Sequence, residues 1–549
     1  MTKQKNPKLK WLIADLAWHI EPIDMIRTHS RPLPLMEAVV RCFRFCLLGA
    51  LLLASAGQWG NQKASGQTSG TRPDPNQQFS GDDSGPALIQ AIESSLINAI
   101  ADCEQSVVAI TRVRNDSAPP SPMNSLPFVP TLQLSNEPTS EDFVPAFFGS
   151  GIIVSEDGFI VTCAHILDDP RKHSYYVWLD RRCYSASVIA MSAQVQASDP
   201  FTDLAVLKIE ATSLKTIPRA TDPPRKGQLV IALGNPNAIA RDGQASASWG
   251  MISNVNRFAP REKDQSPTDS IHHMGTLIQT DVHSPIGTSG GALVNWRGQL
   301  VGMTTNLLAN AGQEQPAGFA IAVDEFFERV VEVLKQGKQP EFGFLGVQPE
   351  NLRAVDLDRG LSGARVSMVI PGLPGSRAGL REGDIIFQVG NSSVGNRNDL
   401  FRELSRVPIG TGTKLRVRRL RAGNWQELSM EAELTKKFIA TDRPAFGLHG
   451  PPTWRGAQVE YGSAIAGELD RISVVRDSPY VAFLNVAPDS PTWRAGLRAG
   501  FGVISINGQT IQSPERFHEL ASRTPGRVTL SAISNDGKQL TVTVEPTPE

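Results

Sequence analysis

The feature of the sequence that most restricts its fold is a serine enclosed by glycines. Ser289 lies within residues 287–291 (Gly-Thr-Ser-Gly-Gly), and the apolar residues 292–294 follow directly. Glycines let the backbone turn sharply here and keep side chains away from the serine hydroxyl. The amides of Gly287 and Ser289 can then point to one spot and stabilise a developing oxyanion. We therefore predict that Ser289 is a nucleophile and that Gly287, Thr288 and Ser289 form an oxyanion hole.

A histidine and an aspartate upstream complete a predicted catalytic triad. His165 follows the strand-like residues 151–154 and the turn at 156–158, and Asp203 precedes the apolar run 204–209. A serine nucleophile needs a neutral imidazole to take its proton, and that imidazole needs a carboxylate to fix its tautomer. We assign His165 as the base and Asp203 as the orienting acid. Either residue alone would more often be structural, but the order His, Asp, Ser favours catalysis.

Further motifs extend this pattern beyond the triad. They lie at residues 149–154, 202–209, 233–236, 278–281, 287–291 and 318–321, with His165 between the first and the second. In this order the motifs resemble those of the HtrA/Deg family of serine proteases. The chain departs from the family at Thr288, where asparagine is usual, and at Ala292, where proline is usual. Thr288 supplies the same backbone amide, so an oxyanion hole remains expected.

The resemblance carries expectations about fold and function. It implies a mainly β protein with a chymotrypsin-like double β-barrel, two six-stranded barrels that meet at a cleft, followed by two PDZ-like α+β domains. It also implies an exported, ATP-independent serine endopeptidase that degrades misfolded or damaged proteins through an acyl-enzyme. Its partners would be unfolded polypeptides and peptide C-termini. The family is built on trimers, sometimes merged into cages, and residues 114–142 would be its regulatory loop.

The composition of the 549-residue chain predicts about three or four domains. Its 54 basic and 55 acidic residues balance, so the charge gives no sign of a nucleic-acid partner. Arg41 and Arg44 precede an apolar run that ends in residues 54–56 (Ala-Ser-Ala), which is the pattern of a secretory signal cleaved after Ala56. The run is short for a membrane-spanning helix. We expect a periplasmic or otherwise exported protein; the alternative is a membrane-anchored protein that faces the periplasm.

The N-terminal region therefore divides into two predicted parts. Residues 1–56 are an N-terminal extension with a signal peptide or anchor, and the Gly-, Ser- and Gln-rich residues 57–85 are a flexible linker. Met36 opens a compact version of the signal. The sequence leaves open whether translation starts at Met1, Met25 or Met36.

Three of the five cysteines, namely Cys103, Cys163 and Cys183, lie outside the predicted signal. A disulfide between Cys163 and Cys183 is left open by the sequence. The Cys and His spacings do not have the pattern of a metal site, and we expect no metal and no cofactor. Because Cys163 is so close to His165 and the serine motif is complete, we prefer the serine to a cysteine nucleophile.

A trypsin-like protease domain is predicted over residues 86–338. Apolar residues at helical spacing occupy 88–100, and residues 107–110 read as the first strand. From 148 to 323, short β-branched runs alternate with turn signals, which favours an all-β barrel or sandwich over a parallel α/β sheet. Helical spacing returns over residues 324–335.

The C-terminal part contains an internal repeat that resembles PDZ domains. Residues 377–386 and 494–503 share the pattern Arg-Ala-Gly-Leu-Arg-x-Gly, and a hairpin and a helix follow each copy. We place the two domains at 340–437 and 454–547, with a linker over 438–453. A PDZ domain binds a peptide C-terminus as an added strand beside a loop that holds the carboxylate.

In the first copy we predict this carboxylate-binding loop at Phe344, Leu345, Gly346 and Val347. The amides would face the anion, and the apolar side chains would line a pocket. In the second copy, where the first strand is placed at 454–459, we find no matching loop. Weaker peptide binding is expected there, and the sequence leaves open whether it occurs.

The substrate pocket is predicted beside the nucleophile loop. His283 and Ser284 would form its floor, and Met303 and Thr304 would lie on the opposing strand. None of these residues is acidic, so we expect cleavage after Val, Ala or Leu rather than after Lys or Arg, which would be buried without a countercharge. The alternatives are a chaperone or PDZ peptide-binding scaffold with little protease activity, and a narrow processing protease. The complete triad argues against the first and the paired PDZ copies against the second.

Overall fold

The structure is a computed structural model that describes most of the chain from residue 84 onwards. The described residues are 84–115, 137–140, 143, 145–179, 182–186, 193–235, 244–259, 270–306, 318–440, 444–465 and 481–547. The predicted signal or anchor lies outside this part, as do nearly all of the predicted linker 57–85 and most of the predicted loop 114–142. Among the helices that are described, none combines the length and the apolar character that crossing a membrane requires.

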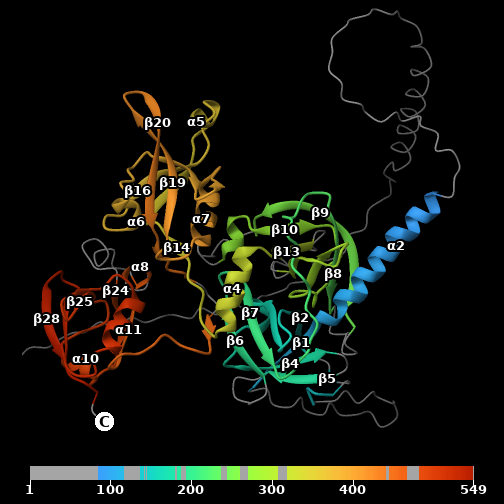
Figure 1. Ribbon diagram of the computed structural model, residues 1–549, viewed down its shortest axis with the longest axis horizontal. Coiled ribbons are helices and arrows are strands. Elements are labelled where there is room, and N and C mark those ends of the chain that lie inside the picture. Colours follow the sequence, from blue (N-terminus) through green and yellow to red (C-terminus); the bar gives the residue numbers. More distant parts are fainter. Residues whose placement is uncertain are drawn as a thin grey trace, which may run out of the picture. The chain divides into compact units, whose positions relative to one another are not determined.

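The first described element is the helix α2 (Ser84–Cys103), drawn in blue in Figure 1. Ala99 and Cys103 at its C-terminal end are buried in the protease core. Its N-terminal half differs from a buried helix, because Leu88 and Ile89 are 64% and 69% exposed. Helical spacing shows which side chains share a face, but whether anything covers that face is decided by tertiary packing.

The first half of the protease domain is an antiparallel sheet with the strand order β22-β6-β7-β3-β2-β1-β4-β5. Its strands are β1 (Val107–Arg114), β2 (Phe147–Ile153), β3 (Phe159–Cys163), β4 (His173–Leu179), β5 (Arg182–Ala186), β6 (Ala193–Asp199), β7 (Leu204–Ile209) and β22 (Phe446–Gly447). In the described residues this half is an eight-stranded sheet that includes the added strand β22, whereas six strands were predicted.

The added strand β22 comes from the segment predicted as a linker between the PDZ copies. Phe446 pairs with Ser198 on β6, and the Leu448 amide donates to the Gln196 carbonyl at 2.9 Å. This pairing occupies backbone groups that an edge strand would otherwise present to solvent. Two residues are too few to show the alternation that marks a strand, so the sequence pattern does not reveal this pairing.

The second half of the protease domain is the closed six-stranded barrel that was predicted, with the order β10-β13-β12-β11-β8-β9. Its strands are β8 (Leu229–Gly234), β9 (Ser246–Arg257), β10 (Leu277–Thr280), β11 (Ala292–Asn295), β12 (Leu300–Thr305) and β13 (Gly318–Ala322). A 3-10 turn, η4 (Ile271–Met274), precedes β10, and the predicted helix, α4 (Glu325–Lys335), follows β13. Asp324 caps α4 by accepting a hydrogen bond from the Phe327 amide at 3.0 Å.

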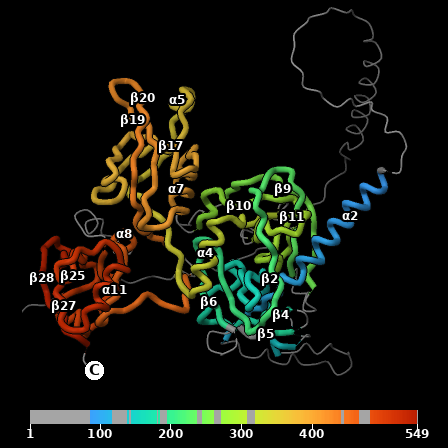
Figure 2. Tube along the Cα trace, in the orientation of Figure 1, coloured from blue at the N-terminus to red at the C-terminus, as the bar shows by residue number. Residues whose placement is uncertain are grey.

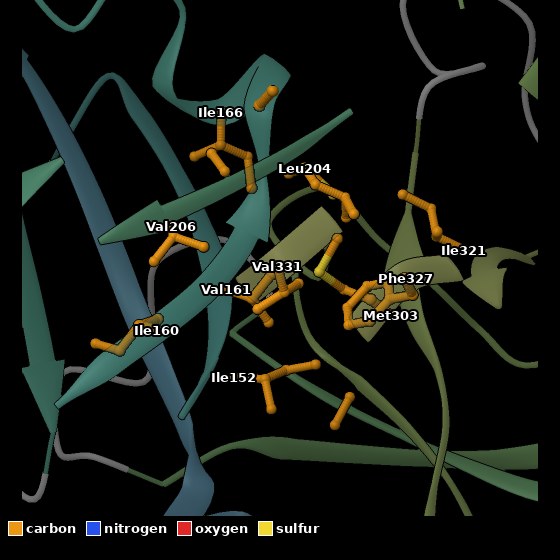
Figure 3. Packing of buried hydrophobic residues seen from close by; sticks show 14 of the residues in the cluster. Ile152, Ile160, Val161, Ile166, Leu204, Val206, Met303, Ile321, Phe327 and Val331 are labelled. Carbon is orange, nitrogen blue, oxygen red and sulfur yellow. The ribbon is translucent and has the colours of Figure 1, made fainter. Parts of the chain in front are cut away.

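One hydrophobic core joins the two halves of the protease domain. Val161 and Leu204 from the first sheet and Met303 from the barrel belong to the same buried cluster as Phe327 and Val331 of α4 (Figure 3). The short helix α3 (Ala164–Leu167), which carries His165, follows β3 at the margin of this core. The packed core thus fixes the strands whose ends carry the predicted triad.

The first C-terminal domain contains a sheet with the order β15-β16-β17-β19-β20 and a separate pair, β14 with β21. The strands are β14 (Gly343–Phe344), β15 (Val347–Asn351), β16 (Ala364–Val369), β17 (Ile385–Val389), β18 (Ser392–Ser393), β19 (Gly412–Arg421), β20 (Asn424–Glu433) and β21 (Thr435–Lys436); the helices are α5 (Ala354–Asp358), α6 (Pro374–Arg377) and α7 (Arg397–Arg406). β15 lies at the end of the strand order, so one of its edges is available for a further strand.

The last part of the chain, drawn in red in Figure 2, repeats this arrangement, with the order β23-β24-β25-β27-β28. Its elements are β23 (Ala457–Tyr461), α8 (Gly462–Ile465), β24 (Val481–Val486), α10 (Pro491–Arg494), β25 (Gly502–Ile506), β26 (Gln509–Thr510), α11 (Pro514–Ser522), β27 (Val528–Ile533) and β28 (Gln539–Val544). The short strands β18 and β26 pair with β17 and β25 in the same way. The repeat in the sequence is therefore also a repeat of the fold.

Candidate active site

The loop that carries Ser289 is held in a sharp turn by two glycines with positive φ. Gly287 has φ 99° and Gly290 has φ 84°, conformations that favour glycine. Ser150 on β2 fastens this loop: its Oγ donates to the Gly287 carbonyl at 2.8 Å, and its amide donates to the Ser289 carbonyl at 2.8 Å. Ser150 lies within one of the sequence motifs, but no role was predicted for it.

His165 and Asp203 meet in the geometry expected of a base and its orienting carboxylate. His165 Nδ1 lies 2.8 Å from Asp203 Oδ2 and 3.1 Å from Oδ1, and the His165 amide donates to Oδ1 at 3.0 Å. Burial raises the pKa of the Asp203 carboxyl, but the charge and hydrogen bonds of His165 outweigh it and hold the pKa below its usual range. Asp203 is thus an ionised acceptor that fixes Nδ1–H and leaves His165 Nε2 free to take a proton.

The turn from Asp199 to Asp203 positions this carboxylate. Asp203 itself has φ 55°, a left-handed conformation that is uncommon for a residue other than glycine. The Asp199 carboxylate accepts hydrogen bonds from the Phe201 amide at 3.3 Å, the Thr202 amide at 3.1 Å and the Thr202 hydroxyl at 2.6 Å. Asp199 therefore closes the turn from which Asp203 projects.

Ser289 Oγ makes its hydrogen bond to a different partner from the one that the sequence suggested. It accepts from the Asn306 amide at 2.9 Å, and within the described residues it has no hydrogen bond to His165. Catalytic hydrogen bonds are often long or absent without substrate, so this arrangement does not conflict with a triad. Asn306 also donates from Nδ2 to the Ser284 and Pro285 carbonyls at 3.1 Å each, a role that the sequence motifs did not indicate.

The predicted oxyanion amides fall into two groups. The Thr288 amide donates to the Pro285 carbonyl at 3.2 Å and so closes the turn. The amides of Gly287 and Ser289, by contrast, have no acceptor among the described residues. Both residues are buried. These two amides are therefore the donors that remain for a developing oxyanion, with Thr288 supporting the turn between them.

The four residues predicted to form the substrate pocket do not share one environment. His283 is exposed, and Ser284 is half-buried with its Oγ 2.9 Å from Thr288 Oγ1. Thr304 is buried and its hydroxyl donates to the Thr288 carbonyl at 2.5 Å.

Met303 departs from the predicted pocket, because its side chain lies in the core cluster of Figure 3. All six residues of β12 are buried, so alternation could not show which face of this strand meets the core.

The cysteines of the described part are all free, including Cys163 and Cys183. Ligand atoms of Cys163, His165 and Asp203 lie within 4.8 Å of one another, a separation that would also suit a metal ion. Burial is the largest influence on the Cys163 thiol and raises its pKa well above the usual range, with Asp203 adding to the effect. The direct 2.8 Å contact between His165 Nδ1 and Asp203 Oδ2 is the contact expected of a proton-transfer unit.

The predicted carboxylate-binding loop of the first C-terminal domain lines a pocket. Phe344, Leu345, Gly346 and Val347 lie on one side of it, and Phe401, Leu404 and Ser405 of α7 lie on the other. Gly346 has φ 75°, and the carbonyls of Leu345 and Gly346 accept from the amides of Gly375 and Ile370 at 2.7 and 3.0 Å. These two carbonyls therefore point into the domain and away from the pocket, as expected of a loop whose amides are predicted to face a carboxylate.

Two known domain families match the chain. The trypsin-like peptidase domain matches residues 149–303, which contain the predicted triad, and the PDZ domain matches residues 343–434. A probable periplasmic serine endoprotease, DegP-like, of Halomonas elongata is 29% identical over 391 residues, which cover 69% of this chain and 74% of the relative. The protein of the same name from Chlamydia trachomatis is 29% identical over 416 residues, covering 74% and 75%. The chain is an exported serine endoprotease that is similar to the DegP-like proteases.

It combines a trypsin-like peptidase domain with a PDZ domain, and it is an exported protein, as the periplasmic relatives indicate. Among solved structures, the serine endoprotease from Yersinia pestis is 26% identical with a TM-score of 0.40, covering 62% of this chain and 97% of that one. The HtrA-type protease AlgW with decapeptide is 26% identical with a TM-score of 0.43, covering 62% and 98%.

The buried Asp199 carboxyl is expected to lower the stability of the folded state as the pH rises. Burial raises the pKa of its carboxyl from 3.8 to about 6, against the opposing hydrogen bonds from Thr202 and Phe201. Between about pH 4 and 6 the folded state therefore binds more protons than the unfolded state, so this group's contribution to stability falls as the pH rises. We expect the free energy of unfolding of Asp199→Asn, relative to that of the wild type, to rise by about 2–3 kcal/mol between pH 4 and pH 7. Chemical unfolding of the protease domain at both pH values measures this change, with the exposed Asp222→Asn as control; an equal change in both variants would contradict it.

Proposed function

We propose that this endoprotease acts through Ser289, His165 and Asp203 and degrades misfolded or damaged proteins. The observation that carries the proposal is the 2.8 Å contact between His165 Nδ1 and the Asp203 carboxylate, inside a trypsin-like domain whose loop presents Ser289. Because no phosphate-binding motif was found in the sequence, energy from nucleotide hydrolysis is not part of the proposal. The protease domain is proposed to span residues 86–338.

In this proposal the reaction proceeds through an acyl-enzyme. His165 Nε2 takes the proton of Ser289 Oγ as the oxygen attacks the peptide carbonyl, and Asp203 stabilises the imidazolium. The amides of Gly287 and Ser289 hold the oxyanion. His165 then gives its proton to the leaving amine, and a water activated by the same imidazole hydrolyses the ester. Ser289 Oγ must first leave the Asn306 amide and turn toward His165.

Casein degradation tests the proposal against its main alternative, a chaperone or PDZ scaffold with little protease activity. The wild-type chain should degrade casein without ATP, and Ser289→Ala should not. A wild type that prevents aggregation of an unfolded protein but leaves casein intact would favour the chaperone. Static light scattering on the same preparation tests the further proposal that the chain forms a homotrimer or a larger oligomer.

We also propose that the PDZ domain, residues 340–437, binds peptides that end in an apolar residue with a free carboxylate. The support is the pocket between residues 344–347 and α7, beside the open edge of β15. An apolar-ended peptide should bind the Ser289→Ala chain at least about tenfold more tightly than its C-terminally amidated twin, since charged hydrogen bonds to the carboxylate are lost in the amide. Titration calorimetry measures both affinities. Equal affinities would refute carboxylate capture.

Residues 454–547 are proposed as a second, PDZ-like domain, joined by the segment 438–453. Its turn at residues 454–456 repeats the backbone bonds of the first loop, because the Arg455 and Gly456 carbonyls accept from the Thr492 and Ala487 amides. Trp454 at this turn packs edge-on against Phe517 with ring centroids 5.3 Å apart. Because this turn lacks the Phe-Leu-Gly-Val sequence of the first loop, peptide binding is expected to be weaker here.

We propose cleavage after small or medium-sized aliphatic residues. Of the residues predicted for the pocket, His283, Ser284 and Thr304 remain as candidates, while Met303 is placed in the core. A lysine or arginine side chain would lack a carboxylate partner beside them and would lose hydration on entering. Mass-spectrometric mapping of casein fragments should give mainly Val, Ala or Leu at the new C-termini. Mainly basic residues there would contradict the proposal.

A further inference from the structure

Next to the triad lies a buried histidine for which the reaction gives no role. His272 in η4 is 1% exposed. Its Nε2 lies 2.9 Å from the Thr202 carbonyl oxygen, and its Nδ1 lies 2.6 Å from Thr276 Oγ1. Thr202 directly precedes Asp203, so the ring contacts the peptide group that leads into the triad's carboxylate residue.

The two contacts determine which nitrogen of His272 carries the proton. A backbone carbonyl only accepts hydrogen bonds, so Nε2 must donate to the Thr202 oxygen. In the neutral ring Nδ1 then accepts from the Thr276 hydroxyl. Burial lowers the pKa of His272, against the opposing charge of Asp203, while His165 adds to the lowering. At neutral pH the ring is therefore a neutral, single donor aimed at the Thr202 carbonyl.

This carbonyl matters because Asp203 has an unusual backbone conformation. Its φ of 55° persists in a residue other than glycine only when the surroundings impose it. Three successive carbonyls supply that restraint. The Phe201 oxygen accepts from the Ile271 amide at 2.8 Å, the Thr202 oxygen from His272, and the Asp203 oxygen from the Ala164 amide at 2.9 Å. The second of these bonds is made by the side chain of His272. It holds the peptide group between Thr202 and Asp203, whose orientation sets φ of Asp203.

We propose that His272 is a positioning residue: its Nε2–H bond to the Thr202 carbonyl holds Asp203 in the left-handed conformation in which the carboxylate reaches His165 Nδ1. The inference rests on the proposed triad and deepens it. It assigns no contact with substrate to His272. Loss of the bond should leave substrate binding intact and slow the chemical step, because the carboxylate would no longer stay aligned with the imidazole.

The test compares variants that keep or remove the donor in the full-length protein. His272→Leu retains the bulk but leaves the buried carbonyl without its partner, so kcat on an aliphatic peptide substrate should fall about 10- to 100-fold while KM stays within about twofold. His272→Gln places an amide NH near the position of Nε2 and should stay within about threefold of the wild type. His273→Gln, a buried histidine of the same turn, is the matched control and should leave kcat unchanged.

A second pair keeps the test decisive if His272→Leu does not fold. His272→Asn is as polar as His272→Gln but too short to reach the Thr202 carbonyl, so only the glutamine should preserve kcat. Equal kcat for the two amides, or wild-type kcat in a folded His272→Leu, would overturn the inference. Ser289→Ala assayed in parallel separates the two proposals, because activity in that variant would refute the triad itself, whereas an inactive Ser289→Ala beside a normal His272→Leu would refute only the positioning role.

Discussion

Replacing Ser289, His165 or Asp203 should each lower turnover by about three to six powers of ten. Ser289→Ala removes the nucleophile and His165→Ala removes the base. Asp203→Asn replaces the carboxylate that accepts the hydrogen bond from His165 by an amide, which no longer holds the proton on Nδ1. The last change is informative here because the Asp203 carboxylate contacts both the ring and the amide of His165. Steady-state cleavage of a peptide substrate, with active-site titration of the folded fraction, measures the effect.

The three residues should behave as one unit. The double variant Ser289→Ala/His165→Ala should be little worse than either single variant, since neither group works without the other. Additive losses would show that the residues act independently. Near-normal peptide cleavage by Ser289→Ala would show that the nucleophile has been assigned wrongly.

Gly290→Ala should lower kcat/KM by about 100-fold or more, although residue 290 itself has no reacting group. Its φ of 84° is strained for alanine, and a Cβ there would collide with the Ser150 carbonyl oxygen and lie 2.5 Å from Thr162 Oγ1. Ser150 holds the loop through the Ser289 and Gly287 carbonyls, so the collision would displace both Ser289 and the oxyanion amides. The same peptide assay measures the loss, and circular dichroism shows that the variant is folded.

Gly423→Ala is the matched control for this substitution. Gly423 has nearly the same conformation, with φ 82°, but a Cβ there would meet no atom within 4 Å. Gly423→Ala should therefore lower the stability of the protein only through backbone strain and leave kcat/KM unchanged. If both variants lose activity equally, the collision with Ser150 is not the cause. If Gly290→Ala is fully active, β2 does not support the nucleophile loop as we describe.

The contacts around residues 199–203 show how much of this site is built by residues outside the triad. Asp199 closes the turn from within, and η4 holds it from the second barrel through the Ile271 amide and the His272 ring. Asp203 thus lies where elements of both halves of the protease domain meet. Its conformation depends on segments that are distant in the sequence, which is why substitution of His272 in η4 is expected to affect turnover.

The residue order alone was enough to predict the mainly β architecture, the helix α4 and the association of His165 with Asp203. These predictions rest on local rules: strands separated by turn signals, a capped helix with an apolar face, and a histidine base that needs a carboxylate to orient it. The pocket lined by residues 344–347 belongs to the same class, because the glycine and its apolar neighbours are consecutive. That this loop binds a carboxylate stays a prediction. The catalytic roles themselves stay predictions until the variants are measured.

Only the tertiary structure decided the features that depend on distant segments. The two-residue strand β22 joins the protease sheet from beyond the PDZ domain, and a segment this short has no periodicity to read. Met303 lies in the core because β12 is buried throughout, so alternation could not assign its faces. Asn306 reaches Ser289, and His272 reaches Thr202, through space rather than along the chain. Local pattern is set by neighbouring residues, whereas these contacts exist only after separate strands and turns have packed together.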